Sequence, residues 1–184
     1  MRVAVVGHVD WIRFCHVDHV PSPGHIAHAT DGWEQAGGAG AVAAVQLALL
    51  ADECHLFTYV GDDELGRRAV AELRDRGVVV HAPADERPTR WAFTHVDERG
   101  ERTITTVGAK LHPRGHDDRL PWEELRTTDA VFFTAGDVDA VVASRRARVL
   151  VATARELPTL AQAGVELDAL IGSATDEAER YEPG

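Results

Sequence analysis

Residues 36–51 read AGGAGAVAAVQLALLA, and this uncharged stretch decides the fold class of the 184-residue chain. Glycine and alanine open it and valine and leucine fill the rest, which predicts a helix over residues 39–51 that is buried on most sides. Short apolar runs that are typical of buried strands lie before and after it. The stretch therefore predicts an α/β domain built around this helix.

Strands and helices alternate outward from that stretch. Strands that alternate with helices pair in parallel through right-handed crossovers, so we expect a doubly wound, mostly parallel sheet flanked by helices. The predicted strands are residues 3–6, 56–60, 78–80, 130–133, 148–152 and 167–171, and the remaining predicted helices are 64–76, 139–146 and 157–163.

Two strand-rich segments, approximately residues 11–31 and 89–107, do not fit that alternation. The second contains two β-prone arms around Asp97–Gly100, which is typical of a hairpin. We expect the two segments to pair with each other at the edge of the sheet as a small β-strand lid.

Three tryptophans, Trp11, Trp33 and Trp91, fall in this predicted lid. Their rings can stack on a sugar or base, or pack between two lids, and the sequence does not decide between the two.

Composition excludes several classes of function. The formal charge of -11 gives no basic surface for nucleic acid, and no apolar run approaches the length of a membrane span. No signal peptide is visible. Cys15 and Cys54 lack a CxxC spacing, which predicts reduced thiols in a cytoplasmic protein. Five of the ten histidines lie between His8 and His28, but not at zinc-site spacing, so we expect no metal site.

Gly37 and Gly38 open the predicted helix of residues 39–51. Without side chains they let a ligand approach the backbone, where free N–H groups at a helix start can donate to its oxygens. They can also serve only to allow a tight turn.

The same glycine run permits a second interpretation. Gly38, Gly40 and Ala43 satisfy the loose pattern G-x-G-x-x-A, and Asp62 lies about twenty residues further on, as in an NAD-binding oxidoreductase. That pattern should follow an apolar strand directly, whereas residues 28–35 are mostly polar. The match is therefore weak.

Several ordered blocks resemble the start of the PfkB/ribokinase family of carbohydrate kinases. They are Gly7 with Asp10, Pro21–Gly24, Ala36–Ala41, Val60–Gly66, Gly77–Val78, Pro88–Thr89, Gly100–Arg102 and Gly108–Ala109. The resemblance covers most of the chain and implies a ribokinase-like fold with a lid.

The resemblance implies a substrate site made of Asp10, Gly37, Gly38 and Ala39. Asp10 would accept hydrogen bonds from the hydroxyls of a sugar or nucleoside, and the glycines would donate from the backbone. Ala39 and Val42 stand where many members have lysine and asparagine, so the substrate cannot be named.

The phosphoryl-transfer part is where the chain departs most from the family. Asp176 falls where the family has a glutamate associated with magnesium and phosphate. By resemblance the catalytic base lies beyond Gly184. The similar run at Thr134–Asp137 comes too early in family order, although a minor substrate-side role for Asp137 stays open. There is no Walker A run.

These observations predict an incomplete ribokinase-like domain over residues 1–184, from a kinase that uses ATP and Mg²⁺ in its full-length form. The 184-residue chain alone should be inactive, and it should bind neither ATP nor Mg²⁺ tightly. The lid implies a possible homodimer. An alternative is a non-catalytic sugar-binding or dimerisation module.

Overall fold

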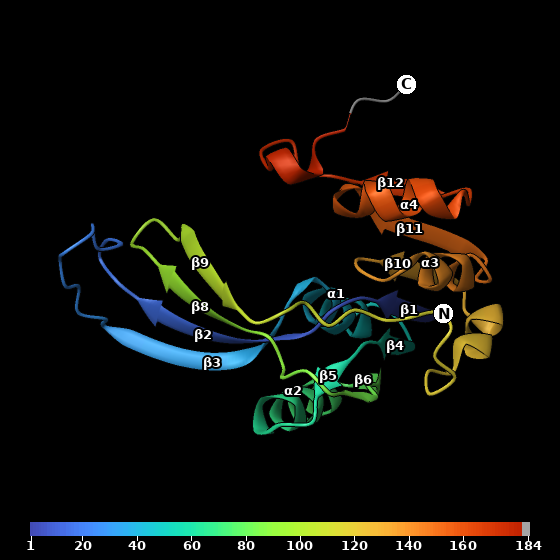
Figure 1. Cartoon of the computed structure of the whole chain (residues 1–184), viewed down its shortest axis with the longest axis horizontal. Coiled ribbons are helices and arrows are strands. Elements are labelled where there is room, and N and C mark those ends of the chain that lie inside the picture. The colour runs from blue at the N-terminus through green and yellow to red at the C-terminus, as the bar shows by residue number, and fades with distance from the viewer. Residues whose placement is uncertain (182–184) are drawn as a thin grey trace.

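The computed structural model describes residues 1–181. A six-stranded sheet forms the body of the molecule, as Figure 1 shows. Every pair of neighbouring strands in it is parallel. In spatial order the strands are β12 (Ala169–Ile171), β11 (Val149–Thr153), β10 (Ala130–Phe133), β1 (Arg2–Val6), β4 (Glu53–Phe57) and β6 (Val78–His81). The predicted mostly parallel sheet is confirmed.

Helices cover the two faces of this sheet in separate groups. Val3 and Val5 of β1 belong to a core formed with α1 (Ala39–Ala48) and α2 (Glu64–Asp75). Ala4 and Val6 belong to a second core formed with α3 (Val138–Ser144) and α4 (Leu157–Ala163). Alternate residues of a strand point to opposite faces, so a short apolar run such as β1 serves both cores.

Helix α1 is shorter and more exposed than the sequence predicts. It ends at Ala48, and Leu49 and Leu50 are 74% and 76% exposed. Only Gly40, Ala41 and Ala44 of the helix are buried. The prediction of burial on most sides is therefore wrong. Within residues 1–181, α1 is covered only on the side that meets the sheet and the start of the lid.

A second difference concerns the predicted strand 56–60. The parallel sheet uses β4 (Glu53–Phe57), and the chain then leaves it to form β5 (Val60–Gly61). That short strand pairs with β7 (Ala84–Asp85) in a separate two-stranded sheet. In addition, the sequence did not predict three short 3₁₀ helices, which are Trp122–Thr127, Ala154–Glu156 and Glu177–Glu179.

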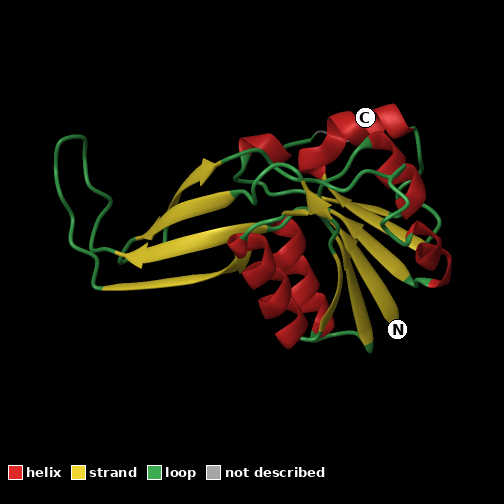
Figure 2. Ribbon diagram, turned by 60° about the horizontal axis from the view of Figure 1, so that its bottom comes forward, coloured by secondary structure: helices red, strands yellow, loops and turns green. Residues whose placement is uncertain are grey.

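The lid is a four-stranded sheet that projects from the body (Figure 2). Strands β2 (Asp10–His16) and β3 (Asp31–Gly37) form one antiparallel hairpin, and β8 (Trp91–Val96) and β9 (Arg102–Val107) form another. The hairpins join through β2 and β8, which run parallel. The expected pairing of the two segments is therefore correct.

The first lid segment is longer than expected. It runs to Gly37 rather than to about residue 31, because residues 31–37 pair with β2 over their whole length despite their polar character. An edge strand with one exposed side tolerates such a composition.

Register divides the lid into two faces. Asp10, Ile12 and Phe14 point to one face, which we call the Asp10 face, and Trp11 and Arg13 point to the other. By the strand pairing, Trp33 lies on the Asp10 face, whereas Trp91 lies on the face of Trp11. In the part of the chain that the structure describes, no helix has the length and apolarity to cross a bilayer.

Candidate functional site

Asp10 and Gly37 lie opposite each other where the lid meets the body. They are register partners at the base of the β2–β3 hairpin. Asp10 is the first residue of β2 and is only 3% exposed. The structure therefore brings the predicted carboxylate beside the predicted glycines, and both lie at the start of α1.

Arg90 holds the Asp10 carboxylate. Its Nε donates to Oδ1 at 2.8 Å and its terminal nitrogen donates to Oδ2 at 2.6 Å. The Arg90 side chain is 14% exposed, so this is a nearly buried, bidentate ion pair, which is a strong and orienting interaction. Each carboxylate oxygen keeps one lone pair, so Asp10 can still accept two hydrogen bonds.

His8 is the third polar residue at this position. Its Nε2 lies 3.6 Å from Asp10 Oδ2. Burial lowers the pKa of His8 to about 4, although the charge of Asp10 opposes the shift. The ring is therefore neutral at pH 7, and Arg90 balances the charge of Asp10. Among the described residues His8 Nδ1 has no hydrogen-bond partner, which leaves a buried acceptor or donor free.

Gly38 needs to be glycine for two reasons. Its φ of 85° lies in the left-handed region, and an added Cβ would meet His8 O and Asp10 N at 3.0 and 3.1 Å. Gly38 is also the N-cap of α1, where no side chain caps the helix. Ala39 follows as the first helical residue. The positive end of α1 thus begins beside Asp10, next to the His8 ring, and Gly40 N at this end already donates to His8 O at 3.1 Å.

The predicted lid tryptophans have different surroundings. Trp11 is buried under the Arg68 guanidinium, 4.3 Å from the ring centroid, and Arg13 lies 5.0 Å over Trp91. Trp33 is 40% exposed and stacks on Phe14 at 4.8 Å. Of the three, only Trp33 shares a face with Asp10.

Asp176, the expected magnesium or phosphate ligand, lies near the end of the described residues. Its carboxylate contacts the Arg155 guanidinium and accepts from Ala178 N at 2.9 Å, which caps the last 3₁₀ helix. Within residues 1–181, neither group of side chains placed to hold an ion includes Asp176. A role for Asp176 with magnesium or phosphate therefore stays a prediction.

Asp137, in the run that resembles the catalytic stretch, has a structural role. It caps α3 by accepting from Ala140 N at 2.8 Å and also accepts from Gly115 N at 2.9 Å. This is what an N-cap aspartate does at any helix start.

Asp63 rather than its neighbour Asp62 is the organising acid after β5. Asp63 caps α2 through Gly66 N and accepts from both N and Oγ1 of Thr89, which lies next to Arg90. Asp62 is 85% exposed, and its carboxylate lies 3.6 Å from the Arg67 guanidinium. In addition, the glycine run follows β3 of the lid and not a strand of the parallel sheet, which disfavours a dinucleotide site.

Sequence reasoning missed Arg90 and His8. Arg90 lies 80 residues from Asp10 in sequence, and no spacing rule connects them. One signal was present: Arg90 directly follows the Pro88–Thr89 block and begins the arm that pairs with β2.

Comparisons with known proteins agree with this architecture. Residues 1–173 match the model of the family described as pfkB family carbohydrate kinase. The chain is 32% identical over 109 residues to a ribokinase of Dictyostelium discoideum, covering 58% of this chain and 34% of that protein. It is 28% identical over 151 residues to an ATP-dependent ribose-1-phosphate kinase of Halopiger xanaduensis, covering 79% and 50%.

A solved structure gives the same fold. The ribokinase of Arabidopsis thaliana complexed with ribose and ATP superposes with a TM-score of 0.63 at 21% identity, over 82% of this chain and 52% of that chain. The chain thus spans about half the length, or less, of these three proteins.

Proposed function

We propose a function from one premise: the chain belongs to the pfkB family of carbohydrate kinases. In this proposal it supplies the substrate-binding half and the lid of an enzyme that transfers a phosphoryl group from ATP to a hydroxyl of a sugar or nucleoside. The base and the anion hole would come from residues beyond Gly184, and the 184-residue chain alone would bind substrate without phosphorylating it.

The observation that carries this proposal is the Asp10 carboxylate held next to the bare backbone of Gly37 and Gly38. Arg90 occupies one lone pair on each oxygen, so a diol can donate to the remaining two. Hydrogen bonds of this charge-assisted kind contribute about 1.5 to 3 kcal/mol. Arg90 would be a positioning residue that fixes the carboxylate.

The charge of the site favours a neutral ligand. Asp10 and Arg90 cancel each other, and burial keeps His8 neutral by lowering its pKa to about 4. The charge of Lys110, the one lysine in the sequence, is also paired, because its Nζ lies 3.5 Å from Glu156 Oε1. We therefore expect uncharged sugars such as ribose, or a nucleoside, to bind more tightly than ribose 1-phosphate.

Binding is the experiment that tests this, because it needs no catalytic residues. Isothermal titration of the chain with ribose, adenosine and ribose 1-phosphate should give saturable binding of a neutral ligand. Asp10→Asn should weaken it about 10- to 100-fold, corresponding to about 1.5 to 3 kcal/mol.

Asp62→Asn is the matched control, since Asp62 is an exposed acid elsewhere on the chain. It should leave binding unchanged, and circular dichroism should show that both variants are folded. Equal affinity of Asp10→Asn and the wild type would refute the assigned role. Binding of ribose 1-phosphate alone would refute the preference for a neutral substrate.

The exposed lid supports a second part of the proposal, a homodimer through the Asp10 face. Phe14 and Trp33 stack there, and Ile104 of β9, which is 51% exposed, lies in the same row of the sheet on the far side of Thr94. Exposed aromatic and aliphatic side chains on an edge sheet are typical of a protein contact. In this arrangement the two lids would cover each other's apolar residues.

A further inference from the structure

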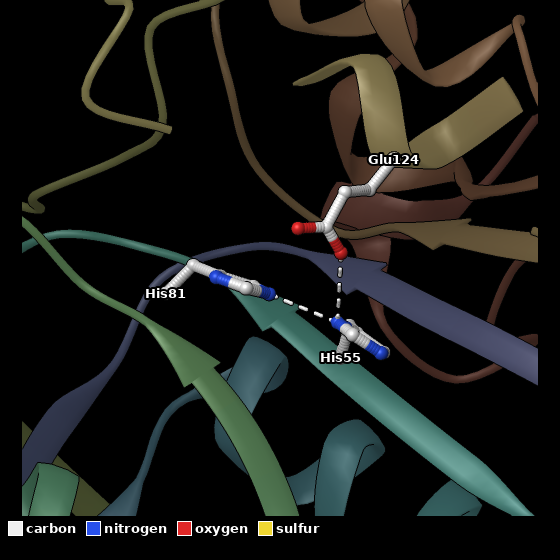
Figure 3. Close-up of side chains that lie close together, drawn as sticks. All are labelled: His55, His81 and Glu124. Atoms are coloured by element: carbon white, nitrogen blue, oxygen red, sulfur yellow. Dashed lines mark hydrogen bonds and ion pairs between the residues drawn. The ribbon is translucent and has the colours of Figure 1, made fainter. Parts of the chain in front are cut away.

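A cluster of two histidines and one glutamate lies away from Asp10, on the face of the parallel sheet that carries α3 and α4. His55 comes from the middle of β4, His81 from the end of β6 and Glu124 from the 3₁₀ helix Trp122–Thr127. Their side chains converge in Figure 3, and their ligand atoms lie within 4.8 Å of one another. His55 is 5% exposed. The cluster takes no part in the proposed kinase function.

The separations within the cluster are near the edge length of a metal-coordination tetrahedron. His55 Nδ1 lies 2.9 Å from His81 Nε2 and 3.6 Å from Glu124 Oε2. Metal bonds of about 2.0 to 2.1 Å to nitrogen or oxygen put neighbouring ligands of a tetrahedral ion about 3.3 to 3.4 Å apart. A small adjustment of side chains would therefore place one ion between all three.

A carboxylate behind His55 completes the arrangement. Glu53 Oε1 lies 3.0 Å from His55 Nε2, the ring nitrogen that faces away from the cluster. To bind an ion, His55 would carry its proton on Nε2, donate to Glu53 and offer the Nδ1 lone pair, which is how metal-binding histidines are usually oriented. This tautomer gives up the hydrogen bond that Arg2 Nε donates to His55 Nε2, and the ion would replace the hydrogen bond between His55 Nδ1 and His81 Nε2.

The charges near the cluster balance. Glu53 and Glu124 contribute two negative charges, whereas Arg2 and Arg74 lie near enough to His81 to contribute two positive charges. The chemistry of the three ligands, and not a net charge, therefore argues for a metal ion. Arg2 donates to Glu124 Oε2 at 2.6 Å, and its Nε donates to His55 Nε2 at 3.1 Å and lies 3.3 Å from Glu53 Oε2. A carboxylate oxygen has two lone pairs, so Glu124 can keep Arg2 and still bind an ion.

The surroundings restrict water on one side. Phe57 packs against His81 with ring centroids 4.9 Å apart, and Trp122 stacks on Phe57 at 5.3 Å. Two imidazoles and one carboxylate suit Zn²⁺ rather than Mg²⁺ or Ca²⁺, which prefer all-oxygen sites.

We propose that His55, His81 and Glu124 bind a Zn²⁺-like divalent transition-metal ion, with water as the fourth ligand. The ion would tie β4, β6 and the 3₁₀ helix together and stabilise the edge of the sheet. This contrasts with the expectation from sequence, where the histidines that attracted attention were those between His8 and His28.

Titration of chelator-treated protein with Zn²⁺ tests the proposal. One equivalent should bind, and the melting temperature should rise with the Zn²⁺ concentration, as linkage requires for an ion that binds the folded state. Titration with Co²⁺ should produce the visible absorption of a tetrahedral site. His81→Gln and Glu124→Gln should each weaken binding of this equivalent at least tenfold. Glu53→Gln, which removes the support of His55, should weaken it about 10- to 100-fold.

His116→Gln is the control. His116 belongs to the exposed group with Asp137 and Asp139, which is the other set of side chains in residues 1–181 that could gather around an ion. His116→Gln should bind one equivalent of Zn²⁺ with the affinity of the wild type. Absence of a one-to-one Zn²⁺ complex, or unchanged affinity in both His81→Gln and Glu124→Gln, would overturn the proposal, as would loss of binding in His116→Gln.

Discussion

The parallel sheet and the lid are both built from short strands, of three to five residues in the sheet and six or seven in the lid, yet they expose very different amounts of side chain. Val5 and Val6 of β1 have no exposed surface, because helices cover both faces of that sheet. Strand β9 of the lid is exposed along its whole length. Burial therefore dictates the residues of the body, whereas the residues of the lid are free to serve a ligand or a second chain.

Removing one phenylalanine from each region should give the largest contrast. Phe133 of β10 is fully buried and Phe93 of β8 is 38% exposed. We expect Phe133→Ala to lower the free energy of unfolding by about 3 to 5 kcal/mol and Phe93→Ala by about 1 kcal/mol or less. Urea denaturation measures both. Similar losses would mean that the lid is as tightly packed as the body.

The junction between the two regions should make stability depend on pH. His8 lies between β1 and β2, and its pKa is about 4 when folded against 6.5 for an exposed histidine. Between these two pKa values the unfolded chain binds more protons at this histidine than the folded chain does. The stabilisation that neutral His8 gives to the fold is therefore fully present above pH 6.5 and is lost as the pH falls toward 4. The loss should reach about 3 kcal/mol.

His8→Asn isolates this effect from the carboxylates that also titrate in acid. The free energy of unfolding should be measured from pH 7 to pH 4 for both proteins. The difference between them should shrink as the pH falls, and a constant difference would contradict the neutral, buried state of His8.

The smallest expected effect concerns the free energy of dimerisation through the lid. If the Asp10 face is a dimer contact, Trp33→Ser should raise the dimer dissociation constant at least tenfold, or about 1.4 kcal/mol. Sedimentation over a range of concentrations measures it. Val142→Ser on α3, where Val142 is 47% exposed, is the control and should leave the dimer intact. A wild-type chain that stays monomeric would exclude this contact.

Most of the body was predictable from sequence because burial leaves a pattern. The run at residues 3–6 is short, apolar and β-branched, and it lies within β1 at the centre of the sheet. Helix α2 was recognisable from Leu65, Ala69 and Leu73 at helical spacing. Element ends were less accurate, as at Leu49 and Leu50, since the sequence alone does not show what covers them.

The candidate site was predictable only in part. Gly37 and Gly38 stand out because glycines before a helix imply exposed backbone, and Asp10 was found by its family resemblance. Its partner Arg90 could not be found because the contact depends on the register between β2 and β8. His55, His81 and Glu124 come from three separate elements, so their meeting is a result of the fold and not of any motif.

The parallel pairing of β2 with β8 has a consequence for the order of folding. It joins Trp11 to Trp91, so the centre of the lid closes only after the chain between them has been placed. Closing so long a loop is slow, and a lone two-stranded hairpin is at best marginally stable. The lid should therefore form late and protect its amide hydrogens from exchange less than the body does.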